Sequence, residues 1–332
     1  MTKHRPHCPF PGFITQISMI RLLGACAGGF FGGGAAFAGD GGVATADALA
    51  MGGAVIADAH ASAALLSSPA TLSLEPRYDL YFGARLGGTS DWLIQTEARD
   101  SRSGPVALGL AYTRRMANPP PEVGDLPGWR LEGEALENPL TENTIALGAG
   151  TALLDRRLAI GLAAVRYARD TALTEPEATY ELSFGLASHP VSGLDLAVSA
   201  VNLIGLARGG DADHPFTLNA GVGGHLEERA RAVASVSADL NEPSEGVPLS
   251  WALGAEATFV DQALPIRVGF SRDAALSTHF LSAGFGLQAP SASLDYAIRY
   301  DVGADGGASA ITGARIWHAL TLRVVLPDDK ES

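Results

Sequence analysis

Few residues in this sequence are spaced for chemistry. It holds no G-x-S-x-G, H-E-x-x-H or Walker loop, the patterns of serine hydrolases, zinc proteases and phosphate-binding loops. The run from His225 to Glu228 has the wrong spacing for a zinc helix. A hydrolase would need a Ser or Asp beside His279 or His318, which lie near predicted strand ends. We therefore predict no catalytic residue, no metal site and no cofactor, in a protein that is not an enzyme.

Segment 116–142 holds the densest group of carboxylates, and Arg130 is the basic residue among them. Acidic external loops can bind divalent cations, although a solvated loop is the simpler interpretation. The carboxylates are Glu122, Asp125, Glu132, Glu134, Glu137 and Glu142.

The charge balance limits the class of partner. The chain has 332 residues, with 23 Lys and Arg against 36 Asp and Glu, and a net charge of −13. Binding to phosphate backbones needs basic patches, so we predict no nucleic-acid partner.

The first 38 residues have the pattern of a signal peptide. Basic residues up to Arg21 precede an uncharged run, 22–38, which ends in the small-x-small sequence Ala36-Phe37-Ala38. Met19 is an alternative start. Cys26 follows Leu-Gly-Ala as in a lipoprotein signal, but little apolar sequence separates it from Arg21.

Export would remove both thiols of the chain, because Cys8 and Cys26 lie in this leader. The remaining chain could form no disulfide, so its stability must come from elsewhere, and a closed sheet would supply it. No stretch after the leader offers 18 predominantly apolar residues, so we predict no transmembrane helix.

Hydrophobicity with a period of two residues dominates the rest of the sequence. In the run 294–300, every even position is apolar or aromatic. Such alternation is typical of strands with two different faces. The predicted strands are 77–86, 91–99, 105–115, 143–154, 157–168, 177–188, 194–204, 215–225, 231–240, 249–259, 265–272, 278–287, 292–301 and 313–326.

The connections between these fourteen runs alternate in length. Starting with 100–104, every second connection is short, and those between tend to be longer, with 87–90 as an exception. Short turns at one end and long loops at the other are typical of outer-membrane barrels. We predict an all-β fold, a 14-stranded antiparallel transmembrane β-barrel over 77–326 with a polar tail at 327–332. An exported β-sandwich or soluble barrel is the alternative.

Aromatic residues gather near the ends of the predicted strands, as in the girdles of membrane barrels. Those near the loop ends are Tyr112, Tyr167, Tyr180, Phe216, Trp251, Phe270, Phe280, Tyr300 and Trp317, and those near the turn ends are Tyr78 and Phe259.

The opposite face of the strands would line the lumen. Its many Gly and Ser residues, such as Gly161, Gly185 and Ser199, leave room inside. Its charges have mixed signs, which favours pairing with each other or with a plug over a selectivity ring. Candidate ligand-binding residues or plug contacts on this face are Arg85, Glu181, Glu256, Asp295 and Arg299.

The segment 39–76 differs from the barrel in composition. It is rich in Ala, is interrupted at Gly52-Gly53, and stops near Ser67-Ser68-Pro69 because proline cannot continue a helix. We predict two short helical pieces that plug the barrel; a periplasmic extension is the alternative. Candidate contacts in this segment are Asp58, His60, Ser68 and Pro69.

Three short stretches then carry a family resemblance. They are Ala48 to Ala54, Ala57-Asp58-Ala59, and Ser68 to Leu72, followed by closing strands that begin near Pro265. In this order the chain resembles the FadL-like superfamily of outer-membrane barrels, the long-chain fatty-acid transporter type, which includes a PorV-like branch. It departs from the family at Ser68 and Thr71, where the family has Asn and Gly, and in its polar end.

The resemblance implies passive transport of a small hydrophobic molecule across the outer membrane. The alternative is a PorV-like scaffold or assembly factor for secreted or surface proteins. The implied partners are outer-membrane lipid and a hydrophobic small molecule, or a secreted protein for the scaffold. A lumen fully blocked by the plug, without an apolar pocket near the loops, would favour the scaffold.

Overall fold

The computed structural model describes residues 45–58, 64–87, 91–117, 140–171, 174–204, 216–226, 229–240, 247–274, 278–303 and 316–326. The predicted signal peptide, His60, the tail 327–332 and most of the acidic segment 116–142 lie outside these residues.

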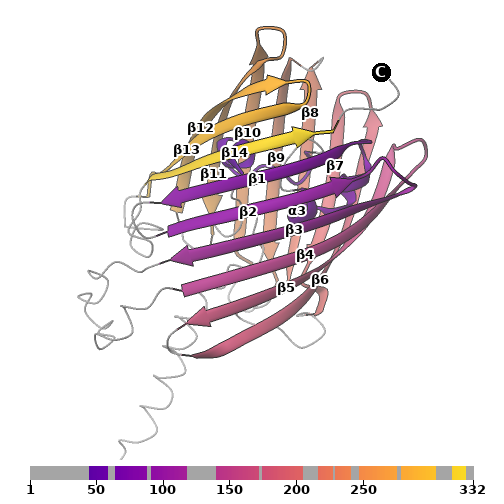
Figure 1. Cartoon of the computed structure of the whole chain (residues 1–332). Helices are drawn as coiled ribbons and strands as arrows, with labels where there is room; N and C mark the ends of the chain where they lie inside the picture. The colour runs from indigo at the N-terminus through magenta and orange to yellow at the C-terminus, as the bar shows by residue number, and fades with distance from the viewer. Residues whose placement is uncertain are drawn as a thin grey trace, which may run out of the picture.

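The described chain forms a closed antiparallel barrel, as predicted (Figure 1). Each strand pairs with its neighbours in sequence, and β1 closes on β14. The strands are β1 (Tyr78–Gly87), β2 (Asp91–Asp100), β3 (Val106–Ala117), β4 (Leu140–Leu153), β5 (Leu158–Thr171), β6 (Thr174–Val191), β7 (Leu194–Val201), β8 (Thr217–Leu226), β9 (Ala230–Asp239), β10 (Leu249–Phe259), β11 (Leu264–Asp273), β12 (Thr278–Ala289), β13 (Ala292–Asp301) and β14 (Ile316–Val325).

The two faces of the wall differ as the alternation predicts. Leu108 and Leu110 of β3 are 58% and 50% exposed, whereas Ala107 and Ala111 are each 2% exposed. The same outward row of large apolar side chains continues around the barrel. An apolar outer band of this extent is stable in a bilayer rather than in water, which makes this a transmembrane barrel.

The largest departure from the predicted bounds is at β6. It has 18 residues, starts at Thr174 rather than 177 and ends at Val191 rather than 188. Its neighbour β7 ends at Val201, after which Asn202 adopts a positive φ of 58°. That turn of the backbone ends the strand three residues earlier than the apolar pattern suggested.

Three short helical pieces before the barrel lie inside it: α2 (Ala46–Ala50), α3 (Ala64–Ser67) and the 3-10 helix η1 (Pro69–Ser73). We call described residues 45–58 and 64–74 the plug. Gly52 and Gly53 follow α2 with φ of 70° and 86°, which L-residues with side chains avoid, so the predicted interruption is real. No helix among the described residues is both long enough and apolar enough to span a membrane.

The predicted aromatic girdle is wrong for four residues. All four are at most 8% exposed: Tyr167, Phe280 and Trp317 face the lumen, and Phe216 is buried just before β8. Trp251, Phe270 and others lie on the outer face. Position near a strand end fixes the level of a side chain along the barrel axis, but not the face of the wall on which it lies. The parity of the residue decides which face it occupies.

Candidate functional site

The wall is shaped to fit the backbone of the plug. A Cβ built on Gly161 would lie 2.4 Å from the Pro69 carbonyl, and one on Gly269 would lie 2.2 Å from the Gly52 nitrogen. Only glycine permits such close approach of two backbones. The room predicted from the small inward residues therefore exists, but the plug occupies it.

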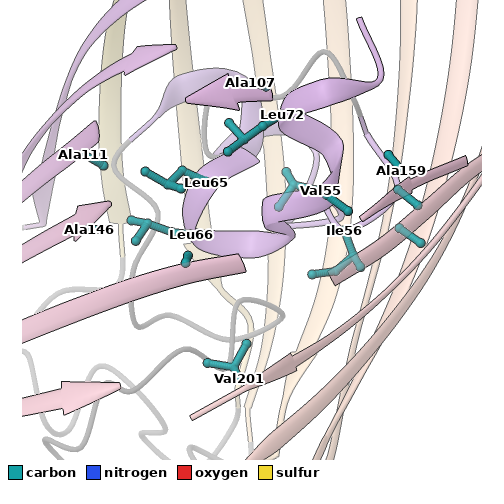
Figure 2. Packing of buried hydrophobic residues seen from close by; sticks show 14 of the residues in the cluster. Val55, Ile56, Leu65, Leu66, Leu72, Ala107, Ala111, Ala146, Ala159 and Val201 are labelled. Atoms are coloured by element: carbon teal, nitrogen blue, oxygen red, sulfur yellow. The ribbon is translucent and has the colours of Figure 1, made fainter. Parts of the chain in front are cut away.

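On one side of the lumen the contact between plug and wall is apolar (Figure 2). Leu65, Leu66 and Leu72 of the plug are at most 8% exposed and pack with small wall residues of β3 to β7. We call this contact the apolar seam. Its wall members are Ala107, Ala111, Ala146, Ala159, Ala163, Val165, Tyr167, Ala187, Ala197 and Val201, and the other plug members are Ala48, Val55, Ile56, Ala57, Ala70 and Leu74.

On the other side the plug is held by charge as well as by smaller apolar contacts of the segment around α2 with β9, β10, β13 and β14. Both carboxylate oxygens of Asp58 accept hydrogen bonds from Arg231 Nη1 at 2.8 Å. Arg231 also lies 3.1 Å from Glu256, and Arg267 bonds Glu256 and Asp295 at 2.5 Å each. This ionic chain joins the plug to β9, β10, β11 and β13. Because all its members are largely buried, each charge depends on its neighbours for compensation.

A few single hydrogen bonds complete the attachment of the plug. They are Ala46 N–H to Thr321 Oγ1 at 2.7 Å, Leu65 N–H to Glu97 Oε1 at 3.4 Å, Ser199 Oγ to the Ser67 carbonyl at 3.0 Å and Arg156 Nη1 to the Ser73 carbonyl at 2.9 Å.

A cavity of about 920 Å³ with mixed polar and apolar walls lies at the turn end of the barrel. All members of the ionic chain except Asp58 line it, together with His189, Asp195 and His225. Asp195 hydrogen-bonds to His189 Nδ1 and His225 Nε2. No group of described residues has the arrangement of a metal site.

The lumen near the loop ends of β1, β2, β12, β13 and β14 is filled by side chains. Trp317 Nε1 donates to Asp91 at 3.2 Å, and Asp91 pairs with Arg85 at 3.4 Å. The guanidinium of Arg299 lies 3.5 Å from the centre of the Phe280 ring, which packs edge-on against Trp317. These contacts link side chains of five strands in this part of the lumen and involve no residue of the plug.

Eight of the nine candidate residues fall in different groups, and the ninth, His60, lies outside the described residues. Asp58, Glu256 and Asp295 meet in the ionic chain, and Arg85 and Arg299 lie in the aromatic cluster near the loop ends. The remaining described candidates are Glu181, buried and hydrogen-bonded to Tyr167, and Ser68 and Pro69, buried at the start of η1.

The sequence analysis missed Arg231 and Trp317. Arg231 stands between Ala230 and Ala232 in an apolar strand and shares the parity of Val233, which faces inward. A cation at an inward position was the available signal. Trp317 shares the parity of Thr321 and Arg323, opposite to the outward Leu320 and Leu322, so parity was the available signal for its direction as well.

The two candidate histidines near strand ends have aromatic neighbours. His279 stacks on Phe270 with 5.8 Å between ring centres, and His318 Nδ1 lies 2.7 Å from the Tyr296 hydroxyl. These contacts orient the rings on the outer face of the barrel, away from the lumen.

No protein-family model matches the chain, and no curated protein sequence matches it. Solved structures do match its fold. The CymD monoaromatic hydrocarbon channel superposes with a TM-score of 0.62 at 11% identity, covering 86% of this chain and 98% of that one. The fold is FadL-like.

Two further structures agree with this FadL-like fold. The Ralstonia pickettii toluene transporter TbuX has a TM-score of 0.60 at 12% identity, covering 85% of this chain and 98% of that one. A Pseudomonas aeruginosa FadL homologue has a TM-score of 0.53 at 11% identity, covering 85% and 97%. At these identities the likeness concerns the fold alone.

Proposed function

We propose that the chain is an outer-membrane channel for passive transport of a small hydrophobic molecule, gated by its plug. The apolar outer band places the barrel in a membrane, and its FadL-like fold is shared with a monoaromatic hydrocarbon channel and a toluene transporter. The observation that carries the proposal is the apolar seam between plug and wall.

The seam offers a path that a hydrophobic molecule can open at small net cost. Burying a leucine side chain stabilises a structure by about 2 kcal/mol, so separating Leu65, Leu66 and Leu72 from the wall into water is unfavourable. A hydrophobic molecule that inserts there restores apolar contact. Water and ions do not, so the seam favours hydrophobic cargo.

The ionic chain cannot be opened in this way. Removing Asp58 from Arg231 leaves a largely buried guanidinium short of a partner, which costs about 3–5 kcal/mol. A hydrophobic molecule supplies no charge to replace it. In this mechanism α3 and η1 move, while the segment of the plug that ends at Asp58 stays attached to β9.

The scaffold alternative receives less support. The plug does fill the middle of the lumen, but its contact with β3 to β7 is apolar, and the three structural relatives include no scaffold. If the channel proposal fails while the barrel is found in the outer membrane, a scaffold for secreted proteins becomes the better interpretation.

Two engineered disulfides test the proposal, in a chain with Cys8→Ser and Cys26→Ser. Ser67→Cys with Ser199→Cys joins α3 to β7, where the two residues share a hydrogen bond. Ala46→Cys with Thr321→Cys joins the start of α2 to β14, again across a hydrogen bond. Toluene uptake is measured in cells carrying each protein in the outer membrane, with and without reductant.

The first disulfide should abolish uptake until it is reduced, and the second should leave uptake unchanged. Membrane fractionation and a heat-shifted gel band establish that each variant is a folded barrel in the outer membrane. Uptake no faster than in cells without the protein contradicts transport. Equal inhibition by both disulfides contradicts the seam as the path.

A further inference from the structure

A group of rings lies beside an arginine on the outer face of the barrel, near the loop ends of β10, β11 and β12. Trp251 and Phe270 have ring centres 5.4 Å apart, and Phe270 stacks on His279 with planes 11° apart. Arg272 is the cross-strand neighbour of Trp251 on one side and of His279 on the other. We call these four residues the rim cluster.

Parity places the rim cluster outside the lumen. The residues that alternate with it, including Ser250, Ser271 and Thr278, are at most 5% exposed and face inward. Arg272 itself is exposed, and four residues before it on β11 the outward Val268 belongs to the apolar band. The cluster therefore lies at the boundary between the apolar band and the loops.

The charge of Arg272 has no partner among the described residues. The outward positions of β9 to β13 carry no carboxylate in the described chain, and Arg272 and His279 are their basic residues. An arginine facing lipid costs up to a few kcal/mol at mid-membrane and little near an interface, where anionic groups of lipids can pair with it. An anion from the lipid is thus the natural complement.

We infer that the rim cluster binds the phosphorylated sugar headgroup of an outer-leaflet glycolipid of the lipid A type. The planar guanidinium of Arg272 can donate two parallel hydrogen bonds to a phosphate, and His279 stands in the same cross-strand row as a further donor. The Trp251 ring gives an apolar face against which a sugar ring can pack. A headgroup with both phosphate and sugar uses all these features, whereas a glycerophospholipid uses only the cations.

The inference rests on the outer-membrane location in the proposed function and on an orientation with the loop ends in the outer leaflet, because the long loops of outer-membrane barrels lie on the extracellular side. It does not depend on transport, because the rim cluster and the apolar seam lie on opposite faces of the wall. A channel that fails to carry toluene would still bind the glycolipid, so the two proposals can fail separately.

Native mass spectrometry of the folded full-length barrel in detergent measures binding of bis-phosphorylated lipid A, of lipid A with its phosphates removed, and of phosphatidylglycerol. Arg272→Gln should weaken binding of the phosphorylated glycolipid about tenfold, the effect of losing charge-assisted hydrogen bonds. Trp251→Leu should weaken it about threefold to tenfold, with little change for phosphatidylglycerol.

Arg114→Gln is the matched control. Arg114 is also an exposed outward arginine near a loop end, on β3, but its cross-strand neighbours are Ile94 and Asn143 rather than rings. This variant should bind the glycolipid as the unchanged protein does. Every variant must show the same heat-shifted band on a gel, so that loss of binding is not loss of folding.

Three results would overturn the inference. One is equal weakening by Arg272→Gln and Arg114→Gln, which means general attraction of anions. The second is equal binding of glycolipid with and without phosphates. The third is phosphatidylglycerol binding as tightly as lipid A and with the same dependence on Trp251, which removes the sugar from the recognition.

Discussion

Gly161 offers the sharpest perturbation of the plug. The β-carbon of Gly161→Ala would lie 2.4 Å from the Pro69 carbonyl and 2.5 Å from the Ala70 nitrogen. Both neighbours are backbone atoms at the start of η1, so no side chain can rotate away. The barrel strand is held by its own ladder of hydrogen bonds to β4 and β6, and we therefore expect η1 to move instead.

The size of the effect follows from the contacts. Overpacking a close contact typically costs about 1–3 kcal/mol, which raises the population of a displaced plug by about 5-fold to 150-fold. At Gly148→Ala the new atom would lie 2.1 Å from Leu65 Cδ1, the end of a flexible side chain that can adopt another rotamer. That relief costs about 1 kcal/mol, so the second variant should displace the plug less.

The assay follows a single thiol in the apolar seam. In a chain with Cys8→Ser and Cys26→Ser, Leu66→Cys places a thiol where the side chain is 8% exposed. Its labelling rate by a water-soluble maleimide reports how often α3 leaves the wall. Gly161→Ala should accelerate both labelling and toluene uptake. Across the glycine variants, the ranking by uptake rate should match the ranking by labelling rate.

Gly104→Ala is the control, because an added β-carbon there meets nothing within 4 Å. It should label at the rate of the unchanged protein. The reasoning is refuted if Gly161→Ala labels no faster than Gly104→Ala while remaining a folded barrel, or if Gly148→Ala exceeds Gly161→Ala. Faster labelling without faster uptake would separate plug movement from transport and contradict gating by the plug.

Three further predictions concern buried polar groups. Asp58→Asn should lower the stability of the plug by up to about 3–5 kcal/mol, because Arg231 keeps only Glu256 of its two carboxylate partners; the loss is measured as faster proteolysis of residues 45–74 in the folded barrel. Adding Arg231→Gln should recover part of the loss, and full additivity would contradict the pairing. Glu97→Gln should leave the unfolding temperature unchanged or raise it. Glu97 Oε2 lacks a hydrogen-bond partner among the described residues, and the amide oxygen of Gln can still accept from the Leu65 N–H as Oε1 does. A fall in unfolding temperature as large as that of Glu97→Ala would show that the charge of Glu97 is needed. Trp317→Leu should reduce the free energy of unfolding by about 3 kcal/mol through the lost ring contact and Asp91 hydrogen bond, and a loss below 1 kcal/mol in thermal unfolding would contradict this packing.

The strand pattern could be predicted because the two faces of this wall lie in different surroundings. Lipid selects Leu, Val and Phe outside, and the plug selects Gly, Ala and Ser inside, so the alternation is strong in runs such as 292–301, whose bounds the structure reproduces. Close to the strand ends neither lipid nor the plug borders the wall so uniformly. There the residue types of Phe280 and Trp317 did not show which face of the wall they occupy.

The site was harder to predict than the fold. Alternation shows that Glu256 and Asp295 face inward, but it does not show that Arg267 bridges them, because pairing across strands depends on register. The partner of Asp58 is still less accessible from sequence. Asp58 and Arg231 are 173 positions apart, and only the closed barrel with its plug in place brings them together.

The asymmetry of the plug contacts links the structure to the proposed selectivity. The wall meets the plug backbone through glycines on all sides, so shape alone does not distinguish one side from the other. Energy does: separating the ionic chain requires charge to be replaced, whereas opening the apolar seam exposes apolar area and breaks only the single hydrogen bonds of Leu65, Ser67 and Ser73 to the wall. A molecule that supplies apolar area without charge can open the seam and cannot open the ionic chain. A charged solute gains nothing at the seam, and at the ionic chain it must displace partners already bonded at 2.5–3.1 Å. Under the proposed function, discrimination between hydrophobic and charged solutes thus resides in the plug contacts rather than in the width of the barrel.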